Sequence, residues 1–368
     1  MKNPLYAASL FFFLIIIAGL QLQAQTAYKK PAKKVLAISG GGARGAWGLG
    51  VAESLFDKEG GYQAVFGTST GSLMAPMVLL QQWDKLEKQY TSVTQESIFN
   101  KNPFKVAKVN GAVTTKLKSF NAIWRLIWGK PTLGETKNLR NLIGQTFTPQ
   151  DFALLKSRYP VDSLSLNVAT TNMSSGRSDI RSSDRINDYE DMIDWIWASA
   201  NQPVFMSYTM KNDSAYVDGG VREIVPLRAA VSYAISHHID TLEVIINDSR
   251  QARDTVWSVN ENKGYFKGGL MRVLEVYNSN TLFYNIWSGE KLTELHDITV
   301  DYSPNPADGD LTIIIYSMPY GLAAKYRDEL GFDKGMMTYL LQCGKDFINK
   351  QQYDSLTHQV YQANRKAK

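Results

Sequence analysis

The sequence is poor in the residues that build metal centres and disulfides. It has one cysteine, Cys343, and four histidines in 368 residues. A single cysteine excludes an internal disulfide and a cysteine-ligated metal. No His-Glu-x-x-His spacing and no Ca²⁺-type acidic cluster occurs, so we predict neither a metal nor a cofactor. Cys343 lies in an apolar run, which favours a buried small side chain over a reactive thiol.

A large excess of one charge sign is also missing. The chain has 40 lysines and arginines against 35 aspartates and glutamates, a formal net charge of +5, with both signs mixed along its length. No basic run is interleaved with aromatic residues, so nucleic acid is not an expected partner. The slight excess is compatible with an anionic membrane surface but does not demand one. Nothing in the sequence indicates an obligate protein partner.

An almost continuous apolar run, Leu10 to Leu20, lies near the start of the chain. It follows the positive Lys2 and precedes the small residue Ala24, a pattern typical of a signal peptide over residues 1–24. The run is short for a membrane-spanning helix, although an uncleaved N-terminal anchor is the alternative. We therefore expect an exported protein, periplasmic or secreted, for which membrane association stays open.

The remainder has ordinary globular composition, with 44% of the whole chain hydrophobic and 20% charged. Lys33 to Ser39 predicts a buried strand, which is followed by three glycines, a helix-like run that ends at Gly60, and a second strand at Tyr62 to Phe66. This succession predicts an α/β fold with a mostly parallel central sheet. Later strands are expected at Leu164–Thr171, Ala215–Val217, Thr241–Asn247, Ile298–Tyr302 and Leu311–Ser317, and later helices at Asp191–Ala200, Pro226–Ser236, 262–295 and Asp333–Lys350.

These elements predict one domain over residues 33–350, with a helical insertion at about 83–148 and an α/β extension at about 250–350. The insertion has a polar, basic part and an apolar stretch from Phe120 to Trp128 that includes Trp124. That stretch predicts a short helix with two interpretations. It packs as the core of a helical subdomain, or it forms a lid that faces lipid through Trp124 and Trp128.

The glycines around Ser69 form the pattern that carries the chemistry. Gly67, Ser69 and Gly71 make a G-x-S-x-G motif between a predicted strand and a helix-compatible run. This context is typical of a nucleophile elbow, which exposes a serine hydroxyl on a sharp turn. Alone the motif is frequent by chance, and the alternative is a serine in an ordinary turn.

Gly40, Gly41 and Gly42 can supply the donors that acyl transfer requires. Consecutive glycines let backbone N–H groups face a ligand, and the helix that follows adds its positive end. Gly40, Gly42 and Gly45 also fit the dinucleotide-binding G-x-G-x-x-G motif. The acidic residue expected about 20 positions later would be Glu59, which lies at a helix end rather than after the second strand. We therefore prefer the oxyanion interpretation.

Two kinds of base are available to Ser69. Asp218 followed by His237 or His238 has the chain order of an ordinary hydrolase triad. The two histidines, however, precede a buried strand and so belong to the edge opposite the expected site. Asp218 follows a short strand and precedes Gly219 and Gly220, so its carboxylate can project from a tight turn. The alternative role for this aspartate is simple turn capping.

Three ordered motifs together resemble the patatin-like phospholipases. They are ISGGGARG, GTSTG and the short DGG, and the similarity extends to WASANQPVF and VPLRAAVSYAI. It covers most of residues 33–250. The resemblance implies a three-layer α/β/α sandwich and a Ser-Asp dyad that hydrolyses acyl esters of lipids. The chain departs from many relatives at Ser72, where they have glycine or alanine, and Pro76 lies inside the helix that follows the elbow.

The resemblance implies a role for each matching residue. Ser69 would be the nucleophile and Asp218 its base and orienter. The oxyanion loop would be Gly40, Gly41 and Gly42, with a further donor from Thr70. The supporting positions would be Arg44, Gly67, Gly71, Gly219 and Gly220.

We predict a serine lipid acyl hydrolase of the phospholipase A or lipase type. The partner expected from this prediction is a lipid or acyl-ester substrate. Two alternatives stay open: a soluble carboxylesterase or thioesterase on the same fold, and an inactive relative that only binds lipid.

Overall fold

The computed structural model describes residues 28–109, 112–118, 124–125, 127–249, 299–303 and 311–364. The chain divides into two units, Met1–Lys30 and Pro31–Lys368. Of the first unit only residues 28–30 are described, and all that follows concerns the second. The predicted signal peptide, the predicted helix at 262–295 and most of the stretch Phe120–Trp128 lie outside the described residues. Across the described ranges, no helix combines the length and apolarity needed to cross a membrane.

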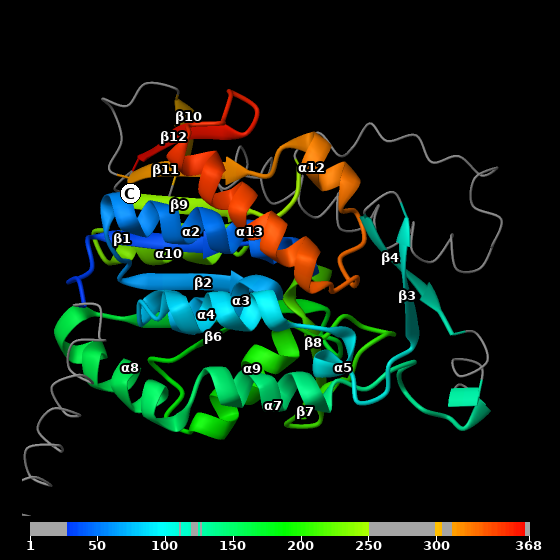
Figure 1. Ribbon diagram of the computed structural model, residues 1–368. Helices are drawn as coiled ribbons and strands as arrows, with labels where there is room; N and C mark the ends of the chain where they lie inside the picture. Colours follow the sequence, from blue (N-terminus) through cyan, green and yellow to red (C-terminus); the bar gives the residue numbers. More distant parts are fainter. Residues whose placement is uncertain are drawn as a thin grey trace, which may run out of the picture. The chain divides into compact units, whose positions relative to one another are not determined.

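In the described part of the chain, ten strands form one mixed sheet in the order β10-β12-β11-β9-β1-β2-β5-β8-β7, with β6 paired to β5 (Figure 1). The parallel strands at its centre are β1 (Lys34–Ile38), β2 (Ala64–Thr68), β5 (Ser165–Asn172), β9 (Thr241–Ile246) and β11 (Leu311–Ser317). The antiparallel strands are β6 (Arg177–Ser182), β7 (Thr209–Lys211), β8 (Ser214–Asp218), β10 (Thr299–Ser303) and β12 (His358–Asn364).

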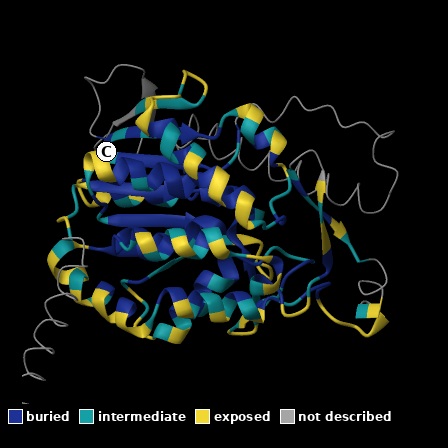
Figure 2. Ribbon diagram, in the orientation of Figure 1, coloured by how far each residue is buried: buried dark blue, intermediate teal, exposed yellow. Residues whose placement is uncertain are grey.

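Strands β1 and β2 are buried along their whole length because helices cover both faces of the sheet (Figure 2). Such strands are near-continuous apolar runs, as KVLAI in β1 and AVFGT in β2 illustrate. On one face, Val35, Phe66 and Val244 pack against Ala230 and Val231 of α10. On the other face lie α2 and α13, which pack closely together (Figure 1).

The helices form two layers, one on each face of this sheet, which confirms the predicted three-layer α/β/α architecture. They are α2 (Gly45–Glu59), α3 (Thr70–Leu79), α4 (Trp83–Ser92), α5 (Gln95–Ile98), α7 (Lys137–Thr146), α8 (Pro149–Asp162), α9 (Tyr189–Ser199), α10 (Leu227–Ser236), α12 (Tyr320–Lys325) and α13 (Lys334–Asn349), with 3-10 turns η1 (Gly42–Arg44) and η2 (Gly219–Val221). Local signals set several of their starts. Thr148 and Asp151 form a capping box at α8, and the Asp333 side chain accepts the N–H of Met336 at α13.

The insertion at 83–148 is not the purely helical subdomain that the sequence predicts. Besides α4, α5 and α7, it contains an antiparallel strand pair, β3 (Phe104–Val109) and β4 (Ala112–Leu117). The β3–β4 pair is separate from the main sheet. In β4, buried Val113 and Thr115 alternate with more exposed residues, a period-two pattern typical of a half-exposed strand.

The C-terminal end adds a strand and changes one expectation. After residue 350, β12 pairs with β11 and extends the sheet by an antiparallel strand. Cys343 on α13 is half-buried rather than buried. It faces Tyr339 one helical turn earlier, and burial raises the pKa of its thiol. A raised pKa keeps the thiol protonated at neutral pH, so the expectation of an unreactive cysteine stands.

Candidate active site

Ser69 sits on a sharp turn between β2 and α3. Its backbone has φ 54° and ψ −121°, a conformation that a side-chain-bearing residue rarely adopts. A Cβ at Gly67 would lie 2.5 Å from backbone atoms of Gly71 and Ser72, and one at Gly71 would lie 2.3 Å from the Ile38 carbonyl oxygen. Both glycines are therefore required by close backbone approach, and the turn has the backbone geometry of a nucleophile elbow.

The strand register brings Asp218 beside this turn. Strand β5 pairs with β2 as far as Ala169, which is opposite Thr68. From Thr170 onward it pairs instead with β8, and Asp218 is opposite Thr170. The chain leaves β2 at Ser69, so β8 continues the sheet where β2 ends. Two strands far apart in sequence thus deliver Ser69 and Asp218 to one point.

The Asp218 carboxyl group is buried and lacks a cationic partner among the described residues. Burial raises its pKa to about 7, while hydrogen bonds from Ser69 and from the Gly220 N–H oppose the rise and the charge of Glu329 adds to it. The Gly220 N–H lies 2.7 Å from Oδ1. A carboxylate with a pKa near neutrality is a stronger base than an exposed one.

Ser199 and Asn201, at the end of α9, hold the two turns together. The Ser69 N–H donates to Ser199 Oγ at 3.0 Å, and this hydroxyl donates to the Ala169 carbonyl at 2.6 Å. The Asp218 N–H donates to the Asn201 carbonyl at 2.9 Å. Both residues belong to the segment WASANQPVF, so its serine and asparagine fix the backbone on which Ser69 and Asp218 stand.

The glycine loop offers fewer free donors than its sequence suggests. The Gly40 N–H donates to the Ile224 carbonyl at 2.9 Å, so it is already engaged. Within the described residues, the N–H groups of Gly41 and Gly42 have no acceptor, nor does that of Thr70 at the first position of α3. Gly41 and Gly42 both have positive φ, 146° and 52°. Gly40 instead allows its backbone to approach Ser69 closely, since a Cβ there would lie 3.3 Å from the Ser69 Cβ.

Arg44 closes the glycine loop against the C-terminal part of the chain. Its guanidinium donates to both carboxylate oxygens of Asp248 at 3.1 Å and also pairs with Glu329. The Glu329 carbonyl accepts the Ala43 N–H at 2.9 Å. It also lies 2.1 Å from the place of a Cβ on Gly42, so only glycine fits there. The two acids neutralise Arg44, whose role is to hold the loop.

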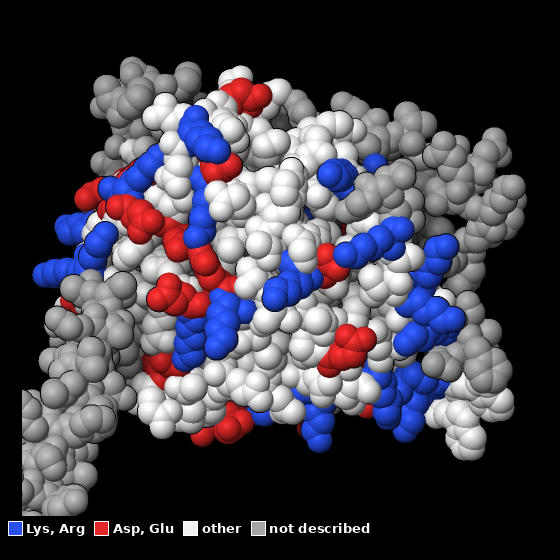
Figure 3. Space-filling model, in the orientation of Figure 1, with Lys and Arg blue, Asp and Glu red and all other residues white. Residues whose placement is uncertain are grey.

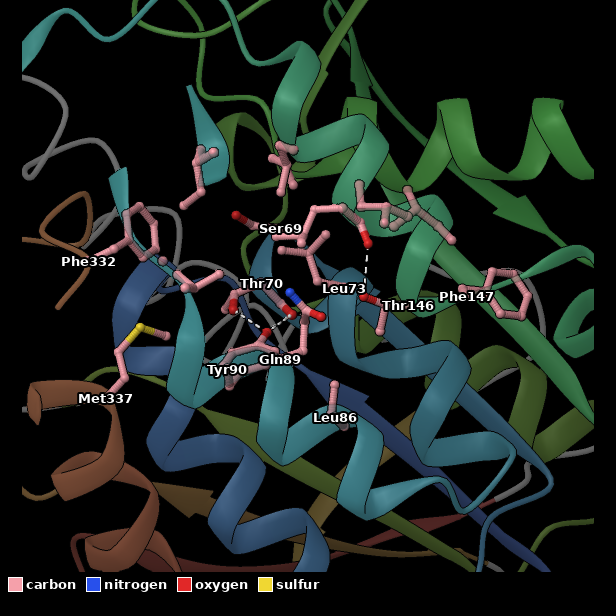
Figure 4. A pocket seen from close by; sticks show the side chains of 18 of the residues that line it. Ser69, Thr70, Leu73, Leu86, Gln89, Tyr90, Thr146, Phe147, Phe332 and Met337 are labelled. Carbon is pink, nitrogen blue, oxygen red and sulfur yellow. Dashed lines mark hydrogen bonds between the residues drawn. The ribbon is translucent and has the colours of Figure 1, made fainter. Parts of the chain in front are cut away.

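A cavity lined mainly by apolar side chains opens at Ser69 (Figure 4). Its walls come from α3, α4, α7 and α9 and from the segment before α13. They include Leu73, Leu86, Ile143, Phe147, Ile196 and Phe332. The Tyr90 hydroxyl donates to the Thr70 carbonyl at 2.9 Å and bonds the Thr70 hydroxyl at 2.7 Å, so these polar groups satisfy one another. The cavity is suited to an apolar chain attached to a group at Ser69.

The two histidines of the alternative triad lie elsewhere. His237 and His238 are exposed at the end of α10, just before β9 begins. His237 stacks on Tyr233 and bonds its carbonyl. Strands β9 and β2 both run parallel to β1. The start of β9 and the end of β2 therefore lie at opposite ends of the parallel strands. Neither imidazole can contact Ser69. Across the described residues, no group of three or more potential ligands is placed to hold a metal ion.

Sequence reasoning missed Glu329, Asp248, Ser199 and Asn201. Ser199 and Asn201 lie in the segment WASANQPVF, which resembles the patatin-like family, but no sequence pattern gave either residue a role. Asp248 follows a predicted strand directly, and the ends of parallel strands gather at one edge, so its place was accessible to reasoning. Glu329 is 285 residues from Arg44 in sequence, and no local pattern connects the two.

Comparison with known proteins identifies the family of the chain. A family model described as patatin-like phospholipase matches residues 36–231. No match is found among curated protein sequences. Among solved structures, VipD from Legionella pneumophila is similar at 12% identity and a TM-score of 0.35, over 85% of this chain and 67% of VipD. That likeness is too low to carry an argument, but the family match spans more than half of the chain. The chain belongs to the patatin-like phospholipase family, whose members are lipid acyl hydrolases.

Proposed function

We propose that this protein is a serine lipid acyl hydrolase of the phospholipase A type, with Ser69 as nucleophile and Asp218 as base. One observation carries the proposal. A buried carboxyl group with a pKa raised to about 7 lies beside a serine on a strained turn, at the mouth of an apolar cavity. An ordinary turn serine has neither the base nor the cavity.

In the acylation step, Asp218 accepts the Ser69 proton as the serine oxygen attacks the ester carbonyl carbon. The carbonyl oxygen becomes an oxyanion, which the N–H groups of Gly41, Gly42 and Thr70 stabilise. Loss of one such donor typically slows an enzyme by about 10²–10³. When the carbon–oxygen bond breaks, the leaving alcohol takes the proton from Asp218. Ser69 then carries the acyl chain as an ester.

In the second step, Asp218 accepts a proton from water, whose oxygen attacks the acyl-serine. Collapse of this second oxyanion releases the fatty acid and returns the proton to Ser69. The acyl chain occupies the apolar cavity throughout, which favours lipid esters over short, polar ones. A soluble carboxylesterase or thioesterase would use the same two residues, so the cavity is the feature that favours lipid.

The test is hydrolysis of a lipid panel by wild type and Ser69→Ala in the presence of EDTA, together with labelling by a fluorophosphonate probe. We expect fatty-acid release and labelling by wild type only, with loss of at least about 10³-fold in the variant. A His237→Ala/His238→Ala double variant should keep full activity. Unchanged hydrolysis by Ser69→Ala would refute the proposal, and labelling without lipid hydrolysis would favour a soluble ester substrate.

We also propose that the enzyme is exported through the signal peptide at residues 1–24 and meets its substrate at a membrane surface near Trp124 and Trp128. Fractionation of cells that express the full chain tests export. Retention of the intact N-terminus in the cytoplasmic fraction would contradict it.

A further inference from the structure

We infer that the β3–β4 pair and the described residues 124–125 and 127–130 form a docking surface for an anionic phospholipid bilayer. The surface comprises Lys105, Lys116 and Lys130 with Trp124, Ile127 and Trp128, and we call it the docking surface. The inference deepens the proposed function and rests on it, since it names the physical form in which the lipid substrate is met.

The charge of this region is unlike that of the rest of the chain. Residues 101–130 contain seven lysines and arginines and no aspartate or glutamate, although the whole chain has 40 basic and 35 acidic residues. The rest of the chain is therefore slightly acidic. Figure 3 shows blue side chains gathered at the right of the view, where Figure 1 places β3 and β4. The basic character of the protein comes from this one region.

Two of these lysines are arranged at a cost to the fold. Lys105 and Lys116 are directly opposite in the β3–β4 register, so their side chains share one face. Like charges in that position destabilise a strand pair. Both are exposed, and neither forms an ion pair with a described residue. Lys108, in contrast, pairs with Asp333 at 2.8 Å. The unpaired lysines are thus available to an anionic partner.

The apolar members of the docking surface are large and exposed. Trp124 is 43% exposed, Ile127 68% and Trp128 73%. Exposure of two tryptophans and an isoleucine next to lysines is unfavourable in water, because apolar surface stays hydrated. The combination suits a bilayer interface, where indole rings lie at the headgroup level and lysines reach the lipid phosphates.

The β3–β4 pair is also joined to the cavity wall. Thr115 donates its hydroxyl to Asp328 at 2.8 Å, and a Cβ on Gly331 would meet Val113 at 2.8 Å. The same short segment supplies Leu330 and Phe332 to the cavity. A bilayer held by the docking surface would therefore lie close to the opening through which an acyl chain reaches Ser69. A protein partner would explain the positive charge but not this proximity.

Vesicle co-sedimentation of the full-length Ser69→Ala protein tests the inference without lipid turnover. We expect binding to vesicles of phosphatidylglycerol and phosphatidylcholine, weak binding to pure phosphatidylcholine, and loss of binding at high salt. Adding Lys105→Gln and Lys116→Gln should weaken partitioning about 30-fold, since one lysine near an anionic surface contributes about fivefold. Adding Trp128→Ser should weaken it about tenfold on both vesicle types.

Matched controls separate the surface from a general charge effect. Lys33→Gln with Lys88→Gln removes the same charge from exposed sites elsewhere, and Val161→Ser removes another exposed apolar side chain; both should bind like the parent. With Ser69 present, Lys105→Gln/Lys116→Gln should keep its activity on a soluble short-chain ester but lose activity on anionic vesicles. Equal binding by this variant and its control would overturn the docking surface. Loss of hydrolysis in Ser69→Ala but not in these variants would still support the hydrolase.

Discussion

Two buried carboxylates of the same sheet, Glu243 within β9 and Asp218 at the end of β8, have different partners. Glu243 in β9 is fully buried, and it accepts hydrogen bonds from Lys34 Nζ at 2.7 Å and from the Tyr62 hydroxyl at 2.6 Å. Asp218 is also buried, and its carboxylate accepts the Gly220 N–H at 2.7 Å but has no cationic partner among the described residues. The first group is supplied with a cation, whereas the second is not.

The difference separates a structural carboxylate from a chemical one. Lys34 also pairs with Glu59, and the two acids raise its pKa against the lowering effect of burial, so Lys34 stays charged. The cation nearest the glycine loop, Arg44, is instead bound to Asp248 and Glu329. The pKa of Asp218 therefore stays near 7, and the cost is a buried carboxyl group that is poorly solvated.

The largest effect should come from Asp218→Asn, which removes the base beside Ser69. We expect kcat to fall by at least about 10³-fold, because an amide cannot accept the Ser69 proton. The same substitution should increase the free energy of unfolding above neutral pH. Burial raises the pKa of Asp218 from about 4 to about 7, so the contribution of this group to wild-type stability is present below pH 4 and is lost as pH rises through 7.

At pH 9 the Asp218→Asn variant should therefore unfold less readily than wild type, by at most about 4 kcal/mol, and the two should converge below pH 4. Denaturant unfolding at both pH values, beside kinetic assays, measures this. An inactive variant that is less stable than wild type at every pH would show that Asp218 is a structural group like Glu243.

Lys34→Met should give the next largest effect, on stability rather than on chemistry. It leaves Glu243 buried without its cation, which typically costs about 3–5 kcal/mol. Activity on a soluble ester at a temperature where the variant is folded should not change, since Lys34 is at the other end of the parallel strands. Chemical denaturation measures the loss.

Lys33→Met is the matched control, because Lys33 is the exposed neighbour of Lys34 and should cost less than about 0.5 kcal/mol. A Lys34→Met/Glu243→Leu double variant should recover part of the stability. If Lys34→Met lost no more stability than Lys33→Met, the ion pair of Lys34 and Glu243 would not stabilise the fold.

The sequence predicts the residues around Ser69 better than the pair of Lys34 and Glu243, for a physical reason. A nucleophile elbow and a glycine loop require particular residues at fixed spacing, so Ser69, Gly67 and Gly71 leave a local pattern. The pair of Lys34 and Glu243 depends on strand register between β1 and β9, and no local spacing encodes it. The same holds for Glu329, which a distant segment brings to Arg44.

Strand identity is predictable only where one pattern dominates. Buried parallel strands such as β1 and β9 are short apolar runs, and their prediction is confirmed. The β3–β4 pair is missed because FKVAKV and AVTTKL have no regular alternation of apolar and polar residues, so they resemble an irregular basic stretch. The engagement of the Gly40 N–H with Ile224 also depends on tertiary contact, so sequence alone assigns one donor too many.

A smaller effect is expected from Gly42→Ala, which strains the glycine loop. Alanine at φ 52° places a Cβ 2.1 Å from the Glu329 carbonyl oxygen, so the loop must shift. Displacement of one oxyanion donor should lower kcat by about 10²-fold with little change in KM. Gly176→Ala is the control, since its φ is 67° but nothing lies near its Cβ. Equal kcat for both variants would remove Gly42 from the oxyanion site.

The smallest effect concerns the charge that keeps Asp218 near neutrality. Activity should rise with pH as Asp218 loses its proton, with an apparent pKa of about 7 for kcat/KM on a soluble ester. Because the negative charge of Glu329 raises the pKa of Asp218, Glu329→Gln should move this midpoint to lower pH. Asp248→Asn is the matched control, since Asp248 also holds Arg44 but does not contribute to that pKa. A shift in Glu329→Gln alone would assign it to charge, and equal shifts in both variants would assign it to movement of Arg44. An unchanged midpoint in Glu329→Gln would mean that burial, and not the charge of Glu329, raises the pKa of Asp218.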